Sequence, residues 1–447
     1  MSHCSIVPPH MLRALSRSDL TVPARCAERT LLLDDEARHA RIGRIARASF
    51  AIAGGAGDGP DRTVHDAQGA EVLPGTVVRS EGGDATGDAA ADEAYDGLGH
   101  TWRLWSEEYG RDSLDGAGLP LVATVHYGRE YVNAFWNGTQ MVFGDGDGEI
   151  FTRFTASLDV IGHELAHGVT EHTSGLTYQG QPGALNEHVS DVFGTLVKQH
   201  HLQQDAQTAD WLIGAELLMP SVQGEALRSM KAPGTAYDDP RLGTDPQPAH
   251  MRDYVETSDD NGGVHINSGI PNKAFHLVAT TLGGPAWEAP GLVWFDVITG
   301  EIGADCDFVT FAGLTVTAAR ARYGQESAEA EAVSAAWSEV GVMAAAGGGP
   351  DEGAPTTALR LSRSGGVAGM TRSREVRLEE LPEGDAHGIR RLLAAPDLPA
   401  MVEQPARPDT FSYGLREDAE GVDVQIPESA LSSETRELLE RVLRGQD

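Results

Sequence analysis

Positive charge, cysteine and long apolar runs are all scarce in this chain of 447 residues. Lysines and arginines number 34 against 67 aspartates and glutamates, which gives a formal net charge of −33 at pH 7. A chain this acidic repels the phosphates of nucleic acids and the headgroups of anionic membranes, so neither is an expected partner. No run of about 20 apolar residues occurs, which argues against a membrane-spanning helix.

The cysteines, Cys4, Cys26 and Cys306, are too few for a disulfide framework. One disulfide pair remains open, and free buried thiols are the alternative. Residues 2–15 contain histidines, prolines and an arginine but no long apolar core. They therefore do not predict a secretory signal peptide.

Residues 163–167, of sequence HELAH, carry the strongest chemical signal. Residues four apart share one face of a helix, so His163 and His167 can present two imidazole nitrogens to one metal ion. Glu164 lies next to the first histidine and can act on a water at that metal without binding the metal itself. Apolar residues flank the motif at helical spacing, which predicts a mostly buried helix.

A second helical stretch, around residues 183–191, supplies carboxylates. Glu187 and Asp191 are four residues apart and share a face, and the apolar residues between them indicate burial rather than a solvated surface. Glu187 can complete a set of two histidines and one carboxylate, which leaves the fourth position of a zinc ion to water. Asp191 would then accept the N–H of a ligand histidine.

Four blocks of the sequence resemble the thermolysin family of zinc metallopeptidases. Residues 133–148 are similar to the family's substrate-binding edge strand and the turn after it. The HELAH motif and residues 186–191 follow at the family's spacing, and residues 260–269 are similar to its second catalytic block. The four blocks occur in the family's order, which strengthens the resemblance. Together they span roughly residues 95–343.

The resemblance implies a role for each matched position. His163, His167 and Glu187 would bind zinc, and Glu164 would polarise the attacking water and later carry its proton. His265 and Tyr178 would stabilise the oxyanion. Asp260 would orient His265, and Asp191 would orient a histidine that binds zinc.

Substrate contacts are implied in the same way. Asn133, the backbone of Ala134 and Arg228 would hold the main chain of the substrate. The pocket for the residue after the cleaved bond would be entirely apolar, which favours a bulky hydrophobic side chain there. The matched pocket residues are Phe151, Phe154, Val160, Ile213 and Leu227.

The family's upper double-calcium site is predicted to be absent. Asp159 and Asp210 are present at the matched positions, but Lys198, Leu212 and Ala215 stand where further carboxylates would be. Calcium needs roughly six to eight oxygen ligands, and a lysine ammonium would repel the ion and neutralise the two aspartates instead. In this departure the chain resembles the protealysin-like branch of the family.

The fold class expected from these blocks is α+β, with a two-lobed thermolysin-like catalytic domain. Residues 1–50 would be a propeptide, because they are basic and because residues 6–12 (IVPPHML) resemble the proline motif of protealysin-type propeptides. Residues 51–160 would form the β-rich N-terminal lobe, and residues 161–345 the helical C-terminal lobe.

Local patterns refine this expectation. A helix is predicted over residues 30–48, strands within 63–78 and a further helix over 95–109. From residue 157 to about residue 343 the chain is predicted to be helical.

A Gly- and Pro-rich segment, residues 346–357, is predicted to be a linker to a third unit, residues 358–447. The alternation of apolar and polar residues there predicts two strands, a helix over 385–395, two more strands and a closing helix. This small α+β unit resembles emfourin, the protein inhibitor of protealysin-like peptidases. The resemblance implies a tethered inhibitor, and an accessory or adhesion domain is the alternative.

Together these features predict a zinc-dependent neutral endopeptidase that is made as a zymogen. Its partners would be protein or peptide substrates, its own propeptide and its emfourin-like unit. A catalytically silent zinc-binding or interaction protein is the alternative, although every matched catalytic position holds a chemically competent residue. The resemblance implies secretion, and the lack of a signal peptide keeps the cytoplasm as the other possible location.

Overall fold

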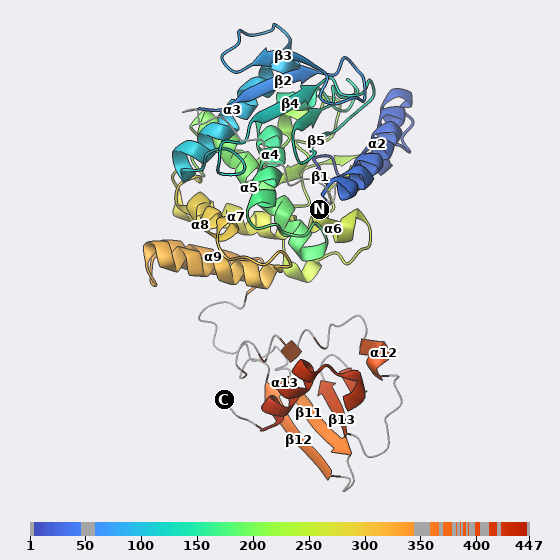
Figure 1. Ribbon diagram of the computed structural model, residues 1–447, viewed down its shortest axis with the longest axis vertical. Helices are drawn as coiled ribbons and strands as arrows, with labels where there is room; N and C mark the ends of the chain where they lie inside the picture. Colours follow the sequence, from blue (N-terminus) through green and yellow to red (C-terminus); the bar gives the residue numbers. More distant parts are fainter. Residues whose placement is uncertain are drawn as a thin grey trace. The chain divides into compact units, whose positions relative to one another are not determined.

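The protein divides into two compact units, residues 1–346 and residues 347–447 (Figure 1). The structure is a computed structural model, which describes residues 4–45 and 59–343 and, in the second unit, residues 358–365, 370–377, 398–402, 411–417, 422–444 and a few single positions. The predicted linker lies outside the described residues. The division of the first unit into a propeptide and two lobes stays a prediction.

A six-stranded sheet forms one part of the first unit, with the strand order β1-β5-β6-β4-β2-β3. The strands β2, β4 and β6 are parallel, and the other neighbouring pairs are antiparallel. The N-terminal strand β1 lies at the edge, beside β5. The bounds are β1 (Cys4–Ser5), β2 (Arg62–Asp66), β3 (Thr76–Ser80), β4 (Leu121–Val125), β5 (Ala134–Trp136) and β6 (Met141–Phe143).

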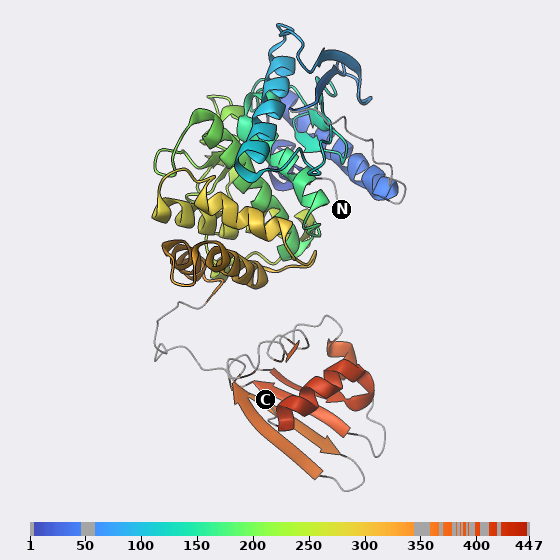
Figure 2. The same cartoon turned by 60° about the vertical axis from the view of Figure 1, so that its left-hand side comes forward.

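The N-terminal segment continues from β1 into two helices, α1 (Pro9–Leu15) and α2 (Thr21–Ile45). Proline suits the first turn of α1 because the backbone N–H groups of that turn have no partner within the helix. The helix predicted over 30–48 is confirmed as far as Ile45, and it begins nine residues earlier than expected, at Thr21. In both views α2 (blue) lies beside the sheet of the first unit (Figure 2).

Two long helices carry the HELAH motif and the carboxylates predicted to join it. They are α4 (Leu158–His172) and α5 (Gly180–Leu202), and glycines allow them to cross closely. A Cβ atom at Gly194 would lie 2.4 Å from the carbonyl oxygen of Asp159, and one at Gly162 would lie 3.0 Å from the Cα of Gly194. Any side chain at Gly194 would therefore push the two helices apart.

The described part of the first unit contains six further α-helices. The predicted helix over 95–109 is confirmed within α3 (Ala89–Tyr109), which packs against α4 and α5. The others follow residue 259 and lie mostly below α5 in Figure 1. They are α6 (Asp260–Asn267), α7 (Gly269–Leu282), α8 (Ala289–Thr299), α9 (Phe308–Tyr323) and α10 (Ala328–Glu339).

The prediction of continuous helical structure from residue 157 is wrong for residues 203–259. This stretch contains two short 3-10 helices and the short strands β7 (Leu212–Ile213), β8 (Arg228–Ser229), β9 (Asp238–Asp239) and β10 (Gly243–Thr244). Aspartate side chains there bind backbone N–H groups: Asp239 accepts from Gln223, and Asp245 accepts from Gly234 and Ala236. Such bonds stabilise turns at the expense of helix.

The second unit is a four-stranded antiparallel sheet with a packed helix. The strand order is β12-β11-β13-β14, with bounds β11 (Ala358–Gly365), β12 (Met370–Arg377), β13 (Phe411–Glu417) and β14 (Val422–Pro427). Helix α13 (Ser433–Arg444) buries Leu439 and Val442 against this sheet. The four predicted strands and the closing helix are confirmed. The helix predicted over 385–395 falls largely outside the described residues, and a short helix α12 (Leu398–Val402) was not predicted.

Within the described ranges, no helix combines the length and the apolar character needed to cross a membrane. Cys26 and Cys306 are free and buried, as expected for thiols outside a disulfide framework.

Candidate active site

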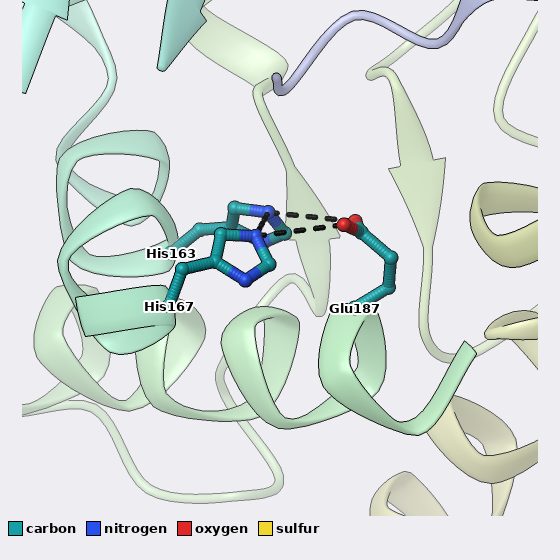
Figure 3. Close-up of side chains that lie close together, drawn as sticks. All are labelled: His163, His167 and Glu187. Atoms are coloured by element: carbon teal, nitrogen blue, oxygen red, sulfur yellow. Dashed lines mark hydrogen bonds and ion pairs between the residues drawn. The ribbon is translucent and has the colours of Figure 1, made fainter. Parts of the chain in front are cut away.

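Three buried side chains meet where α4 and α5 cross (Figure 3). His163 and His167 come from α4, and Glu187 comes from α5. The Nε2 atoms of the histidines are 3.0 Å apart, and each lies 3.5 Å from an oxygen of the Glu187 carboxylate. Their ligand atoms all lie within 4.8 Å of one another, so the three side chains can hold one metal ion.

The outer nitrogen of each histidine faces an oxygen acceptor, which sets its tautomer. Asp191 Oδ1 lies 2.8 Å from His163 Nδ1, and Asn186 Oδ1 lies 2.8 Å from His167 Nδ1. The amide of Asn186 cannot be reversed, because its nitrogen donates to the carbonyl of Leu176 at 3.0 Å. Both histidines therefore carry their proton on Nδ1, and both Nε2 lone pairs face the centre.

This donor set fits a zinc ion. Two nitrogen lone pairs and a carboxylate repel one another at these distances unless a cation lies between them, and imidazole with carboxylate is a common ligand set of zinc. Burial raises the pKa of Glu187, but the positive charges of His265 and Arg228 oppose it and keep the pKa below its ordinary value. Glu187 is thus a carboxylate at neutral pH, as a ligand must be.

Glu164 follows His163 in α4 and is fully buried. Its Oε2 accepts the backbone N–H of Trp136 at 3.0 Å, and its Oε1 is buried with no hydrogen-bond partner among the described residues. Burial, helped by the nearby charge of Glu187, raises the pKa of Glu164 well above its ordinary value. A carboxyl group with one uncommitted oxygen and a high proton affinity is suited to general-base work.

Tyr178 and His265 also contact the Glu187 carboxylate. The hydroxyl of Tyr178 donates to Glu187 Oε1 and lies 3.3 Å from His265 Nε2. His265 Nδ1 lies 2.7 Å from Asp260 Oδ1, and its Nε2 lies 3.1 Å from the carbonyl oxygen of Ser5. Because both neighbours are acceptors, both ring nitrogens carry protons.

The electrostatics of His265 agree with that protonation. Burial lowers the pKa of His265, but the charges of Asp260 and Glu187 have the larger opposite effect and raise the pKa to about 9. The local backbone makes the Asp260 contact possible: Asp260 to Gly263 have φ values of 52°, 52°, 84° and 73°, which the two glycines adopt without strain. The side chain of Asp260 also accepts the backbone N–H of His265 at 3.0 Å.

The residues expected to hold a substrate main chain hold the N-terminal segment instead. Ile6 N–H donates to the carbonyl of Ala134 at 3.2 Å, and Arg228 Nη1 donates to the carbonyl of Ile6 at 3.1 Å. Val7 N–H donates to Asn133 Oδ1 at 2.9 Å, and Asn133 Nδ2 donates to the carbonyl of Val7 at 3.3 Å. Residues 5–7 thus lie along the edge of β5, antiparallel to it.

A buried carboxylate of α2 connects this segment to the residues around it. Asp34 is 3% exposed, accepts from the hydroxyl of Tyr131 at 2.6 Å and from Asn133 Nδ2 at 3.0 Å, and contacts Ser5 Oγ at 3.4 Å. Thr30 Oγ1 also accepts the backbone N–H of Val132 at 2.9 Å. The helix therefore contributes specific polar contacts as well as apolar packing.

His10 is the titratable group of α1 that faces the site. Its Nε2 lies 3.0 Å from the hydroxyl of Tyr237, and its Nδ1 is buried without a partner in the described part of the chain. Burial lowers its pKa to about 4, with Asp260 opposing the shift and His265, Arg228 and Arg13 adding to it.

The five residues expected to line the pocket after the cleaved bond are all buried. They belong to one apolar cluster that also contains Ile6 and Val7, and the members from the predicted pocket are Phe151, Phe154, Val160, Ile213 and Leu227. Ile213 is placed by strand β7, which pairs it with Arg228 of β8. A residue expected to line the pocket and the arginine expected to hold the substrate main chain are thus neighbours in one two-stranded sheet.

Lys198 occupies the place where the sequence predicted a lost calcium site. Its ammonium lies 3.2 Å from Asp159, 3.1 Å from Asp210 and 3.0 Å from Glu216, and the lysine itself is 5% exposed. Burial lowers the pKa of Lys198, but the three carboxylates outweigh it and raise the pKa above its ordinary value. Glu216 was not named from the sequence.

Sequence reasoning also missed other partners of the site. Asn186 and Ser190 contact His167 from one face of α5, and the four-residue spacing that indicated Glu187 and Asp191 could have indicated them. Asn272 donates to Asp191 Oδ2 at 2.8 Å, and no local pattern announces it. Arg228 donates to both oxygens of the same carboxylate, at 2.8 and 2.9 Å.

Comparison with known families agrees with this geometry. Residues 58–171 match the family model "Thermolysin metallopeptidase, catalytic domain", and residues 174–342 match "Thermolysin metallopeptidase, alpha-helical domain". Residues 361–443 match the model of emfourin. The chain belongs to the thermolysin family of metallopeptidases, which is zinc-dependent, and it carries an emfourin domain.

Its relatives place it more narrowly. An extracellular metalloprotease of Pectobacterium carotovorum subsp. carotovorum is 49% identical over 340 residues, which are 76% of this chain and 96% of that protein. A thermolysin of Alicyclobacillus acidocaldarius is 38% identical over 289 residues, 62% of this chain and 50% of that protein. The solved structure of the precursor of protealysin, a metalloproteinase from Serratia proteamaculans, superimposes with a TM-score of 0.70 at 52% identity, covering 76% of this chain and all of that one.

Proposed function

We propose that this zinc-dependent neutral endopeptidase, a zymogen of the thermolysin family, works through the residues assembled at the crossing of α4 and α5. The observation that carries the proposal is the convergence of His163, His167 and Glu187, with Glu164 beside them and His265 opposite. When bound by the three ligands, zinc supplies a Lewis acid that polarises the peptide carbonyl and lowers the pKa of a coordinated water.

The chain's own groups would then divide the proton and charge work. Glu164 takes the proton of the attacking water and returns it to the amide nitrogen that leaves. His265, protonated beside Asp260, and Tyr178 donate to the carbonyl oxygen as negative charge develops on it. Each such donor contributes roughly 3 kcal/mol to the transition state. Asp191 keeps His163 in the tautomer that leaves Nε2 free for the metal.

Substrate would bind where residues 5–7 lie, with its main chain on Asn133, Ala134 and Arg228. The apolar surroundings of this position favour a hydrophobic residue after the cleaved bond. The segment that fills the same anchors keeps substrates out, which accounts for synthesis as a zymogen. We assign this blocking role to residues 1–50, in keeping with the protealysin precursor that the chain resembles.

Two further parts of the molecule have proposed roles. Residues 358–447 would act as a tethered inhibitor, supported by the match to emfourin over 361–443. At the Lys198 site, an ammonium lies among three carboxylates in the place of a bound cation, so this chain would not need calcium there. Secretion is proposed because relatives such as the Pectobacterium enzyme are extracellular. A catalytically silent zinc-binding or interaction protein would keep the metal but hydrolyse nothing.

The decisive experiment is Glu164→Gln in the full chain. Glu164 lies outside the ligand set, so the variant is expected to bind one zinc ion per chain, as the wild type does, by metal analysis. After the same added protease has removed the N-terminal segment from variant and wild type, the variant should hydrolyse casein at least about 100-fold more slowly, because the general base is lost. A variant that retains zinc and near wild-type turnover would overturn the assignment.

A further inference from the structure

The N-terminal strand presents one particular peptide bond to the catalytic groups. Resting on the proposed function, we propose that the enzyme cuts its own chain between Ser5 and Ile6 while the N-terminal segment is docked. Residues 4–7 would then be a bound substrate as well as a plug, and a chain that begins at Ile6 would be an early product of maturation.

The register follows from the hydrogen bonds on the far side of that bond. Both main-chain groups of Ile6 and both of Val7 are bound, to Ala134, Arg228 and Asn133, at 2.9–3.3 Å. The segment runs antiparallel to β5, with Ser5 opposite Phe135. Two consecutive residues with every polar backbone group occupied cannot slide by one position without breaking these contacts.

The contact of one carbonyl oxygen with His265 identifies the carbon that water would attack. Ser5 O lies 3.1 Å from Nε2 of His265, and that nitrogen is 3.5 Å from Glu187 and 3.3 Å from the Tyr178 hydroxyl. The carbonyls of Ile6 and Val7 instead accept hydrogen bonds from Arg228 and Asn133. Ser5 is therefore the residue of this stretch whose carbonyl lies where charge is stabilised.

The reaction is an ordinary hydrolysis and needs only water. The oxygen of water forms a bond to the carbonyl carbon of Ser5, and the bond from that carbon to the nitrogen of Ile6 breaks. Glu164 accepts a proton from the water and passes it to the nitrogen of Ile6. The products are a peptide that ends in the carboxylate of Ser5 and a chain that begins with the amine of Ile6.

The structure also predicts which product stays bound. The Ile6 side retains the contacts with Arg228 and Asn133, the buried apolar side chains of Ile6 and Val7, and the packing of α1. Among the described residues, the peptide ending in Ser5 keeps the short pairing of β1 with β5 and the contacts made by Ser5. It should dissociate, while the rest of the segment continues to fill the site.

The test follows the full chain with zinc over time by intact mass and by labelling of new N-terminal amines. Wild type should form a chain starting at Ile6, at a rate independent of a tenfold dilution, because enzyme and substrate are one molecule. Glu164→Gln should not form it. Ile6→Asp, which puts a charge in an apolar pocket, should also abolish this cut. The matched control is Leu32→Asp. It adds the same charge in α2 at a residue that is 59% exposed, and it should behave as wild type.

Hydrogen exchange gives a readout that does not depend on turnover. In full-length Glu164→Gln, the backbone amides of Ile6 and Val7 should exchange at least about 100-fold more slowly than in an unstructured peptide of the same sequence. Exchange at the unprotected rate would overturn the register.

Failure of the inference is distinguishable from failure of the proposed function. A wild-type sample that matures to full activity on casein without ever containing a chain that starts at Ile6 overturns the self-cleavage and leaves the function intact. The same new end in Glu164→Gln points to a contaminating protease and also overturns it. A zinc-loaded wild-type chain that never cuts itself, and that still leaves casein intact after an added protease has removed its N-terminal segment, overturns both.

Discussion

Removing the ammonium of Lys198 should destabilise the first unit strongly. The pair that matters is the one with Asp159, which is fully buried, whereas Asp210 and Glu216 have side chains 41% and 43% exposed. Contacts with exposed carboxylates contribute roughly 0–1 kcal/mol each. Lys198→Met keeps most of the aliphatic stem but leaves the Asp159 carboxylate buried without a cation, which costs about 3–5 kcal/mol.

The pH dependence of this penalty has a definite sign. Burial raises the pKa of Asp159 above its ordinary value of 3.8, and Lys198 counteracts that shift. In Lys198→Met the native pKa rises further, so the native state binds a proton that the unfolded state has already released. The free energy of unfolding of the variant should therefore fall, relative to wild type, as pH rises above 3.8, and the deficit should be smallest in acid.

The assay is urea unfolding and calorimetry in the Glu164→Gln background, which prevents self-digestion. Lys198→Met should lower the melting temperature by about 5–10 °C. Asp159→Asn combined with Lys198→Met should recover at least about 2 kcal/mol, since a neutral amide needs no cation. Lys231→Met, at an exposed lysine, is the matched control and should change little.

A loss below about 1 kcal/mol for Lys198→Met would refute this account of the site. So would a double variant that is no more stable than Lys198→Met alone, because the two effects would then be independent. Lys198→Glu restores a carboxylate at the matched position and should make the melting temperature depend on calcium, which the wild type should not at this site.

Three more outcomes are expected. Asp34→Ala leaves the Tyr131 hydroxyl without its acceptor and should weaken docking of the N-terminal segment by about 2–3 kcal/mol, seen as an earlier onset of casein hydrolysis. Docking lowers the pKa of His10 from 6.5 to about 4, so the undocked segment binds a proton more readily than the docked one. The equilibrium constant for docking should therefore be highest above pH 6.5 and should fall by up to roughly tenfold per pH unit as the pH drops toward 4. His10→Gln should flatten this pH dependence, measured through the maturation rate. Deleting residues 358–447 should raise the initial rate of casein hydrolysis, and the isolated unit at micromolar concentration should lower it again; equal rates in all three samples would favour an accessory domain.

Much of the site could be predicted because its donors are encoded by short spacings. His163 and His167, and likewise Glu187 and Asp191, are four residues apart, and helical geometry alone places each pair on one face. The apolar residues around them indicate burial, and a buried charge is costly unless it binds a metal or pairs with an opposite charge. These inferences use only contacts within one helix.

The loop stretch 203–259 could not be predicted in this way. Its expected helices are replaced by turns in which Asp239 and Asp245 bind backbone N–H groups nearby. Whether an aspartate caps a turn or lies on a helix surface depends on small local differences, and tertiary packing decides between them. The same stretch nevertheless delivers Arg228 to the site, through the pairing of β7 with β8.

By itself, the sequence determined the kinds of groups present: a pair of histidines and a carboxylate suited to zinc, a glutamate beside them that is suited to general-base work, and a lysine where the family resemblance implies calcium ligands. Only the tertiary structure decided which groups meet across long stretches of chain. Ser5 and His265 are 260 positions apart, and Asp34 and Asn133 are 99 apart. No local pattern relates such residues, because their contact depends on the packing of the N-terminal segment against β5 and on the close crossing of α4 and α5 that Gly194 permits.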